Sequence, residues 1–310
     1  MSDAPRVLIL GGSGQLGQEL QRSFAGTIPL VAVDREAVDL EVPEQIRAII
    51  ASVKPDVILN SAAYTAVDRA ESQPEIAAAV NARAPRILAE QALKAGALLV
   101  HYSTDYVFDG TKEGPWTEED APAPLNVYGK TKLAGEEAIR EVGGRYLIFR
   151  TSWVYGPHGK NFLLTMLRLG RERDQLSVVD DQYGAPTTSL ELARSTRDIV
   201  DGVLAGRFGA AEEWSGLYHM TCGGETTWCG FARAIFARAE AKLDGGKPAV
   251  QPIPTSAYPT PAKRPRNSVL SNAKLQARFG SGLTGWEEAL DVVWQHLAPA
   301  RSEKQNRTDK

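Results

Sequence analysis

The chain has 310 residues, 43% of them hydrophobic and 24% charged, with a net charge of -3. This balance is typical of an ordinary globular protein, and the weak negative charge argues against nucleic acid or an anionic membrane as a partner. No apolar run approaches the roughly 20 residues that span a bilayer, and the first residues lack a basic signal-peptide start, so we expect a cytoplasmic location. Cys222 and Cys229 fit neither a CxxC pair nor a zinc site, so we expect free thiols.

The first half of the chain alternates short apolar runs with helical stretches. The apolar runs predict strands at 6–10, 30–33, 57–59, 97–102 and 146–149. Helical spacing is found between them, at 16–24, 74–94 and 128–141. Uninterrupted apolar strands separated by helices are typical of a parallel sheet that is covered on both faces. The sequence therefore predicts a doubly wound, Rossmann-like α/β fold.

The rhythm changes after about Thr151. Helices are predicted at 161–173, 187–204 and 228–242, a strand at 176–179, a proline-rich loop at 248–265, and two short helices near Ser271 and Trp286. We expect a smaller substrate-binding lobe over the carboxyl ends of the strands, where open sheets bind ligands. The predicted division assigns 1–155 and about 187–205 to a dinucleotide-binding domain, and 156–186 and 206–300 to the lobe. Residues 301–310 are expected to form a frayed tail.

A glycine-rich segment follows the first strand and opens the first helix. It reads Gly11-Gly12-Ser13-Gly14-Gln15-Leu16-Gly17, and two registers, starting at Gly11 or Gly12, share the last two glycines. Glycines here allow a tight turn, a close approach to a pyrophosphate and close helix packing, while the helix N-terminus attracts the anion. The cofactor-binding residues predicted from this loop are Gly11, Gly14, Gln15, Leu16 and Gly17.

The end of the second strand carries two opposed signals. Asp34 stands where a carboxylate accepts from the adenosine ribose of NADH, whereas Arg35 could pair with the 2′-phosphate of NADPH. The residues therefore leave NADH against NADPH open. Further loop positions expected near the adenine and ribose are Asp39, Leu40, Ala62, Ala63 and Tyr64.

The fourth strand and the helix that follows carry the catalytic candidates. Ser103-Thr104-Asp105 closes the strand, and Tyr128 and Lys132 lie four residues apart on one helix face. A phenol can protonate an alkoxide while a nearby ammonium lowers the phenol pKa from ~10 toward neutrality. Thr104 would position the substrate oxygen, and Tyr102 would lie beside the cofactor. The pattern predicts reduction of a carbonyl by a nicotinamide cofactor.

Several ordered segments extend this pattern along nearly the whole chain. They include His101 to Phe108, Pro124 to Lys132, Arg150 to Gly156, Asn161-Phe162, Asp181 to Thr187, and Pro259 to Ala262 with Arg264-Pro265. With these segments the chain resembles the extended short-chain dehydrogenase/reductase superfamily and, within it, the dTDP-4-dehydrorhamnose reductase family. The resemblance implies reduction of the 4-keto group of dTDP-6-deoxy-L-lyxo-4-hexulose to dTDP-L-rhamnose by NADPH or NADH.

The resemblance also implies roles for matching positions. Tyr128 and Lys132 would be the catalytic pair, with Thr104 tuning the proton transfer. The implied substrate-binding residues are Thr104, Asp105, Tyr128, Trp153, Asn161, Gln182 and Arg264. Trp153 could stack on a sugar or base, although a core position is the alternative, and Arg264 matches a diphosphate.

Some relatives form homodimers bridged by magnesium through three glutamates. Glu19 and Glu191 fit two of these places, but the last helix offers Gln295 and His296 instead of a glutamate. Imidazole is a poor ligand for magnesium, so two solvated glutamates are the competing interpretation. Magnesium and the homodimer thus remain open expectations, and no metal ligand is assigned.

Two other functions remain open from the residues. One is a nucleotide-sugar epimerase or dehydratase of the same superfamily, although Tyr106 stands where a dehydratase would carry a glutamate. The other is a non-catalytic regulatory subunit resembling the β subunit of methionine adenosyltransferase.

Overall fold

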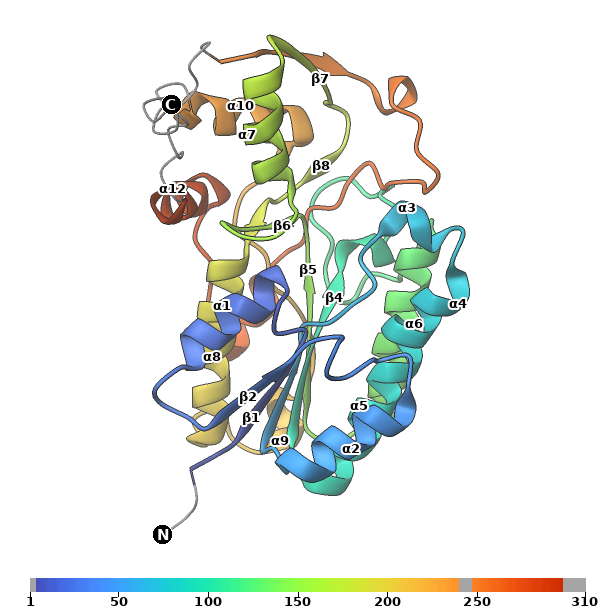
Figure 1. The fold of residues 1–310 in the computed structure, drawn as a ribbon, viewed down its shortest axis with the longest axis vertical. Coiled ribbons are helices and arrows are strands. Elements are labelled where there is room, and N and C mark those ends of the chain that lie inside the picture. Colours follow the sequence, from blue (N-terminus) through green and yellow to red (C-terminus); the bar gives the residue numbers. More distant parts are fainter. Residues whose placement is uncertain (1–3, 240–246, 298–310) are drawn as a thin grey trace, which may run out of the picture.

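The computed structural model describes residues 4–239 and 247–297. Its centre is a sheet of six strands, all parallel, in the order β10-β5-β4-β3-β1-β2 (Figure 1). The strands are β1 (Val7–Leu10), β2 (Leu30–Val33), β3 (Val57–Asn60), β4 (Leu98–Thr104), β5 (Tyr146–Thr151) and β10 (Gly216–His219). The predicted doubly wound α/β fold is confirmed.

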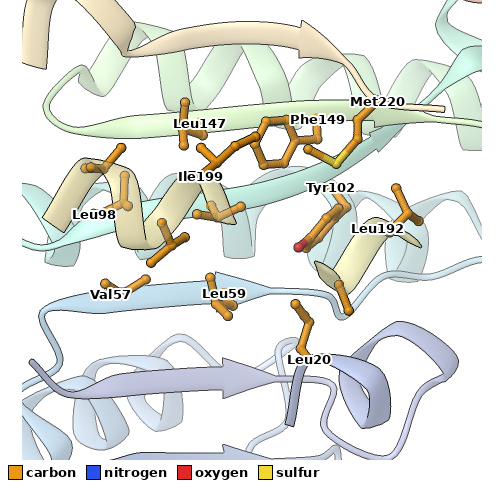
Figure 2. Close-up of a cluster of buried hydrophobic side chains, with 14 of the residues drawn as sticks. Leu20, Val57, Leu59, Leu98, Tyr102, Leu147, Phe149, Leu192, Ile199 and Met220 are labelled. Carbon is orange, nitrogen blue, oxygen red and sulfur yellow. The ribbon is translucent and has the colours of Figure 1, made fainter. Parts of the chain in front are cut away.

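Helices cover both faces of the sheet. On one face lie α1 (Gln15–Phe24) and α8 (Ser189–Leu204), and on the other lie α2 (Pro43–Val53), α5 (Ala84–Ala95) and α6 (Val127–Val142) (Figure 1). Alternate side chains of β1 enter opposite cores, since Val7 and Ile9 belong to one buried cluster and Leu8 and Leu10 to the other. Figure 2 shows the cluster beneath α8. Burial on both faces explains why the strand sequences are uninterruptedly apolar.

The helix predicted at 74–94 is interrupted. The structure has α4 (Pro74–Ala78), a π-helical turn η1 (Ala79–Arg83) and then α5. Pro85, near the start of α5, lacks the N–H that a regular helix would use, so the hydrogen-bond ladder changes register before it. The turn places Asn81 beside the functional site described below.

The remaining elements of the second half pack around a third buried cluster beyond the carboxyl ends of the strands (Figure 1). They are β6 (Val154–Tyr155), α7 (Phe162–Glu172), β7 (Gln175–Val179), β8 (Tyr183–Gly184), β9 (Thr187–Thr188), β11 (Thr226–Thr227), α10 (Trp228–Ala239), β12 (Ala249–Ile253) and α12 (Trp286–His296). Short helical segments complete the described fold: α3 (Val67–Ala70), η2 (Asp105–Val107), α9 (Ala211–Trp214), η4 (Thr255–Ala257) and α11 (Ala273–Phe279).

Six strands of the described structure were not predicted from the sequence: the two-residue strands β6, β8, β9 and β11, and the longer strands β10 and β12. β12 lies inside the predicted proline-rich loop and pairs in parallel with β7, and Pro252 is tolerated because the pair has an open edge. β10 extends the main sheet beside β5, although 206–300 was assigned to the lobe. Leu275 and Phe279 of α11 also join a core of the sheet. We therefore propose that β10 and α11 belong with the dinucleotide-binding half.

The tail predicted at 301–310 and the end of the helix predicted at 228–242 lie outside the described residues. Among the residues that the structure describes, no helix has the length and apolar character needed to cross a membrane. Cys222 and Cys229 are buried and free, as expected.

Candidate active site

A cleft of about 480 Å³ opens at the carboxyl ends of the sheet strands. Thirteen of the fourteen predicted cofactor-binding residues line it, namely Gly11, Gly14, Gln15, Leu16, Asp34, Asp39, Leu40, Ala62, Ala63, Tyr64, Tyr102, Tyr128 and Lys132. Gly17 is the exception. Parallel strands end at one edge of a sheet, which is why loops distant in sequence meet here.

The glycine loop is shaped by close backbone contacts. Gly11 has φ +80°, and a Cβ there would lie 2.8 Å from the backbone nitrogen of Ala62. A Cβ on Gly17 would lie 2.0 Å from the carbonyl oxygen of Gly11. Gly17 therefore shapes the cleft from behind by letting α1 approach the loop, while Gly14 caps the helix and faces the open space. The N-terminus of α1 points its free donors at the cleft, which fits a pyrophosphate.

Asp34 and Arg35 both line the cleft, but each already has partners. Asp34 Oδ1 accepts from the backbone N–H of Glu36 at 3.1 Å. The Arg35 guanidinium is exposed and donates to Glu41 at 2.6 Å, with Asp39 at 3.8 Å. Both side chains nevertheless line the cleft, so Asp34 remains a candidate for binding the adenosine ribose of NADH and Arg35 for binding the 2′-phosphate of NADPH.

A buried asparagine fixes the loop formed by Ala62, Ala63 and Tyr64. Asn81 Oδ1 accepts from the backbone N–H of Tyr64 at 2.9 Å, and its Nδ2 donates to the carbonyl of Tyr64 at 3.1 Å and to the Thr131 hydroxyl at 3.2 Å. Sequence reasoning missed Asn81. Its signal is a polar residue inside an alanine-rich helix, placed in the π-helical turn, where such irregularities mark functional sites.

Tyr128 and Lys132 line one end of the cleft, and Thr104, which does not line it, lies within hydrogen-bonding reach of Tyr128. Thr104 ends β4, and Tyr128 and Lys132 lie in the first turns of α6, which is capped by Asn126 accepting from the N–H of Gly129 at 2.8 Å. The Thr104 hydroxyl donates to Asp105 at 2.9 Å. Tyr128 and Lys132 line the cleft directly, so a phenol and an ammonium face the space predicted for the nicotinamide.

Burial is the main cause of the pKa shifts at the end of the cleft that holds Tyr128 and Lys132. It raises the pKa of Tyr128 to about 12, and a hydrogen bond with Thr104 offsets part of the rise. Burial also raises the pKa of Asp105 to about 7 and lowers that of Lys132 to about 8. In the chain by itself the pKa of Tyr128 is raised rather than lowered, so the expectation that Lys132, together with the positive ring of a bound cofactor, lowers it stays a prediction. At neutral pH the phenol carries its proton.

Lys132 is held from below by protein groups. Its Nζ donates to the Tyr102 carbonyl at 2.5 Å and lies 3.1 Å from His101 Nε2. The Tyr102 side chain points away, into the core of Figure 2, where its hydroxyl and that of Thr196 are 2.7 Å apart. Tyr102 thus serves the site through its backbone.

The remaining predicted substrate residues do not line the cleft. Asn161 caps α7 and donates to Gln15 Oε1 at 2.8 Å. Gln182 is buried and donates to Thr255 at 3.0 Å. Trp153 has φ +47° and stacks on Trp228 with ring centroids 3.6 Å apart.

Arg264 is engaged as well. It donates to Asp68 of α3 at 2.9 Å and to the Ala262 carbonyl at 3.2 Å, which ties the proline-rich segment to the first half of the chain. Asn126 strengthens the same junction by donating to the Lys263 carbonyl at 2.7 Å.

Other residues that line the cleft were not predicted as site residues, and those that are not apolar strand or helix positions include Ser13, Ser61, Thr65, Thr151, Gly159 and Lys160. Thr151 carries the clearest signal, because it ends a buried strand, as Thr104 does. Its hydroxyl is buried without a hydrogen-bond partner and lies beside the catalytic candidates. A polar group without a partner at this place fits a bound carboxamide, so the residues fit a nicotinamide cofactor.

The residues do not fit magnesium. Glu19 pairs with Arg22 and Glu191 pairs with Arg194, and His296 Nδ1 lies 2.9 Å from the Val292 carbonyl. Within 4–239 and 247–297, no group of three or more His, Cys, Asp or Glu side chains is placed to hold a metal ion. No step of the proposed reaction therefore uses magnesium.

Comparisons with known proteins agree with this geometry. Residues 5–298 match the family model described as RmlD substrate binding domain. The chain is 48% identical over 296 residues to a dTDP-4-dehydrorhamnose reductase of Burkholderia thailandensis, covering 94% of this chain and 99% of that one. It is 45% identical to the enzyme of that name from Escherichia coli K12, covering 94% and 97%. A Bacillus anthracis dTDP-4-dehydrorhamnose reductase solved with NADP superposes with a TM-score of 0.86 at 34% identity, covering 94% and 99%.

Proposed function

Because the chain belongs to the dTDP-4-dehydrorhamnose reductase family, we propose that it reduces the 4-keto group of dTDP-6-deoxy-L-lyxo-4-hexulose to dTDP-L-rhamnose. The observation that carries this proposal is one cleft lined by both the glycine loop and the Tyr128–Lys132 pair. A nicotinamide cofactor and a proton donor would then meet at a single place.

The cofactor would be held by the glycine loop, Asp34 or Arg35, the loop of Ala62 to Tyr64, and Thr151. When bound, it supplies the hydride that goes to the substrate carbonyl carbon. NADP in the Bacillus anthracis relative supports NADPH, for which Arg35 would leave Glu41 and pair with the 2′-phosphate. Asp34 keeps NADH as the alternative.

Tyr128 is the proposed proton donor. The phenol is protonated at neutral pH, because burial raises its pKa to about 12, so a proton is ready for the substrate oxygen as negative charge develops there. Thr104, which forms a hydrogen bond with Tyr128, would orient the substrate carbonyl oxygen. Lys132 would stabilise the phenolate left behind, since an ammonium close to an oxyanion lowers its energy in a dry site.

The proposed substrate contacts other than Tyr128 do not line the cleft. Arg264 would bind the diphosphate with its fork of donors after releasing Asp68, and Asp105 would face the sugar beside Thr104. Trp153, Asn161 and Gln182 already contact other parts of the chain, so we propose that they shape this half of the site. The homodimer and the cytoplasmic location remain predictions.

The test supplies the purified protein with the dTDP-4-keto sugar and either NADPH or NADH. We expect one oxidised cofactor for each dTDP-L-rhamnose formed, with the faster cofactor resolving the Asp34 and Arg35 signals. An epimerase would convert sugar without net oxidation of the cofactor. No turnover with either cofactor would favour the regulatory-subunit alternative.

A further inference from the structure

Beneath Lys132 lies a row of fully buried polar side chains that the reaction described above does not use. His101 of β4 and Asn60 of β3 are directly paired across the parallel strands. Asn60, His101 and Lys132 are each 1% exposed. His101 Nε2 lies 3.1 Å from Lys132 Nζ, and His101 Nδ1 lies 2.9 Å from Asn60 Nδ2. Buried polar groups are costly unless their hydrogen bonds are satisfied, so the row needs a defined protonation pattern.

Lys132 sets that pattern. Burial lowers the pKa of Lys132 to about 8 and Glu136, one turn along α6, favours the charged form, so the side chain is an ammonium at neutral pH and donates to the Tyr102 carbonyl. An ammonium has three donors and no acceptor, so His101 Nε2 must accept from it. His101 is neutral, because burial and the neighbouring ammonium hold its pKa well below its usual range. Its single proton is therefore on Nδ1.

This tautomer requires an acceptor on Asn60. A neutral imidazole that accepts at Nε2 donates from Nδ1, so the Asn60 amide is assigned with Oδ1, rather than Nδ2, toward His101. This assignment gives Asn60 Oδ1, which is otherwise buried without a hydrogen-bond partner, a donor. The order of donors is then Lys132 to His101 to Asn60. Two of the three ammonium donors are used below the site, by Tyr102 and His101, and one remains for the cleft.

We propose that His101, held as its Nδ1-protonated tautomer by Asn60, is a positioning residue that keeps the Lys132 ammonium charged and aimed into the cleft. The inference rests on the proposed function only for the role of the ammonium in the reaction; the tautomer and the hydrogen bonds do not depend on it. His101 touches neither substrate nor cofactor and acts through Lys132.

The charged and titratable groups around Lys132 are few. Along α6 these are Tyr128 and Glu136, and β4 contributes His101. Glu136 is also paired with Arg150 of β5, which donates to it at 2.7 Å. Removing the His101 acceptor therefore removes a hydrogen bond to the charged form of Lys132 without changing the formal charge of the site. The pKa of Lys132 falls, and the ammonium is lost at lower pH.

The first test reads the tautomer without using activity. Nitrogen-15 NMR of the imidazoles is recorded on the wild-type chain, whose four histidines are assigned by single substitution. We expect His101 to show a protonated Nδ1 and a bare Nε2 that do not change from pH 6 to pH 7, below the Lys132 pKa of about 8. A proton on Nε2, or titration in this range, would overturn the proposal whether or not the enzyme turns over.

The second test compares His101→Leu with His101→Gln, in which the amide oxygen can replace Nε2. In His101→Leu we expect the basic limb of the kcat profile to move down by about one to two pH units, with KM for the sugar changed less than about twofold. His101→Gln should restore the limb, and His296→Leu is the matched surface control. If both variants lower kcat equally at every pH, His101 is only a packing residue. A wild type that is inactive from the start would refute the proposed function and leave the NMR result standing.

Discussion

In the cleft at the sheet edge, glycines, small side chains and the Tyr128–Lys132 pair face the open space. In the region beyond the sheet, by contrast, the polar side chains expected to bind substrate are held by the chain itself. Arg264 is bound to Asp68, and Asn161 to Gln15. The cleft is therefore prepared by its backbone, whereas Arg264, if it binds the substrate as proposed, must exchange its contact with Asp68 for one with the substrate. The difference predicts that changes in the cleft affect catalysis and folding, and that changes beyond it affect substrate affinity.

The largest effect should come from Tyr128→Phe, which tests the chemical side of the comparison. It removes the proton donor and leaves the ring in place, so we expect kcat to fall by about 100- to 10,000-fold with little change in KM. Steady-state kinetics with the cofactor that gives the faster turnover measure kcat and KM. Tyr106→Phe is the matched control, since its ring packs edge-on against Tyr128, at 5.8 Å between centroids. Unchanged turnover in Tyr128→Phe would refute the proposed mechanism.

The next effect concerns the backbone that shapes the cleft. In Gly17→Ala the new Cβ would fall 2.0 Å from the Gly11 carbonyl oxygen, which forces α1 away from the loop. We expect a loss of about 3 kcal/mol in the free energy of unfolding and weaker NADPH binding. Urea unfolding and cofactor titration measure both. Gly282→Ala, with nothing within 4 Å of the added Cβ and no left-handed φ, is the control for the loss of a glycine without a clash. Equal losses in the two variants would mean that close helix packing is not the reason for Gly17.

Asp105 lies between the two regions and gives a pH-dependent prediction. Its folded pKa, about 7, is above the ordinary value of 3.8, because burial disfavours the charge. The stability it contributes is therefore present below pH 4 and is lost as the pH rises to 7. Asp105→Asn should then be more stable than the wild type by about 2 kcal/mol at pH 8, with the difference vanishing near pH 4.

Urea unfolding at several pH values checks this, with Asp174→Asn on the surface as the control. A difference between Asp105→Asn and the wild type that is constant with pH would show that the Asp105 carboxyl does not titrate in this way.

The smallest effect tests the region beyond the sheet. If Arg264 exchanges Asp68 for the substrate diphosphate, Arg264→Ala should raise KM for the dTDP-sugar about tenfold. Asp68→Asn frees the guanidinium and should leave this KM unchanged or lower it. Isothermal titration with dTDP provides a second reading. If Arg264 only ties the two halves of the chain together, Arg264→Ala and Asp68→Asn should weaken dTDP binding to the same extent.

The two regions also differ in how far the sequence predicts them. Strand ends and the glycine loop are local patterns, and a parallel sheet brings them to one edge, so Gly11, Asp34, Tyr64 and Lys132 were predicted to be near one another and line one cleft. The strand β10 was missed because four residues, Gly216–His219, carry little pattern of their own and join the sheet through long-range pairing with β5. Sequence patterns also cannot show which polar residue is already bound. The pairing of Arg264 with Asp68 and the row of Asn60 and His101 below Lys132 depend on contacts between distant segments.

The most direct measurement follows the hydride itself. The protein is given the dTDP-4-keto sugar with NADPH or NADH deuterated at the transferred position, and the product is examined by mass spectrometry and proton NMR. The account predicts dTDP-L-rhamnose with one deuterium at C4 and one oxidised cofactor for each product. Product without deuterium at C4, or sugar conversion without oxidised cofactor, would contradict it.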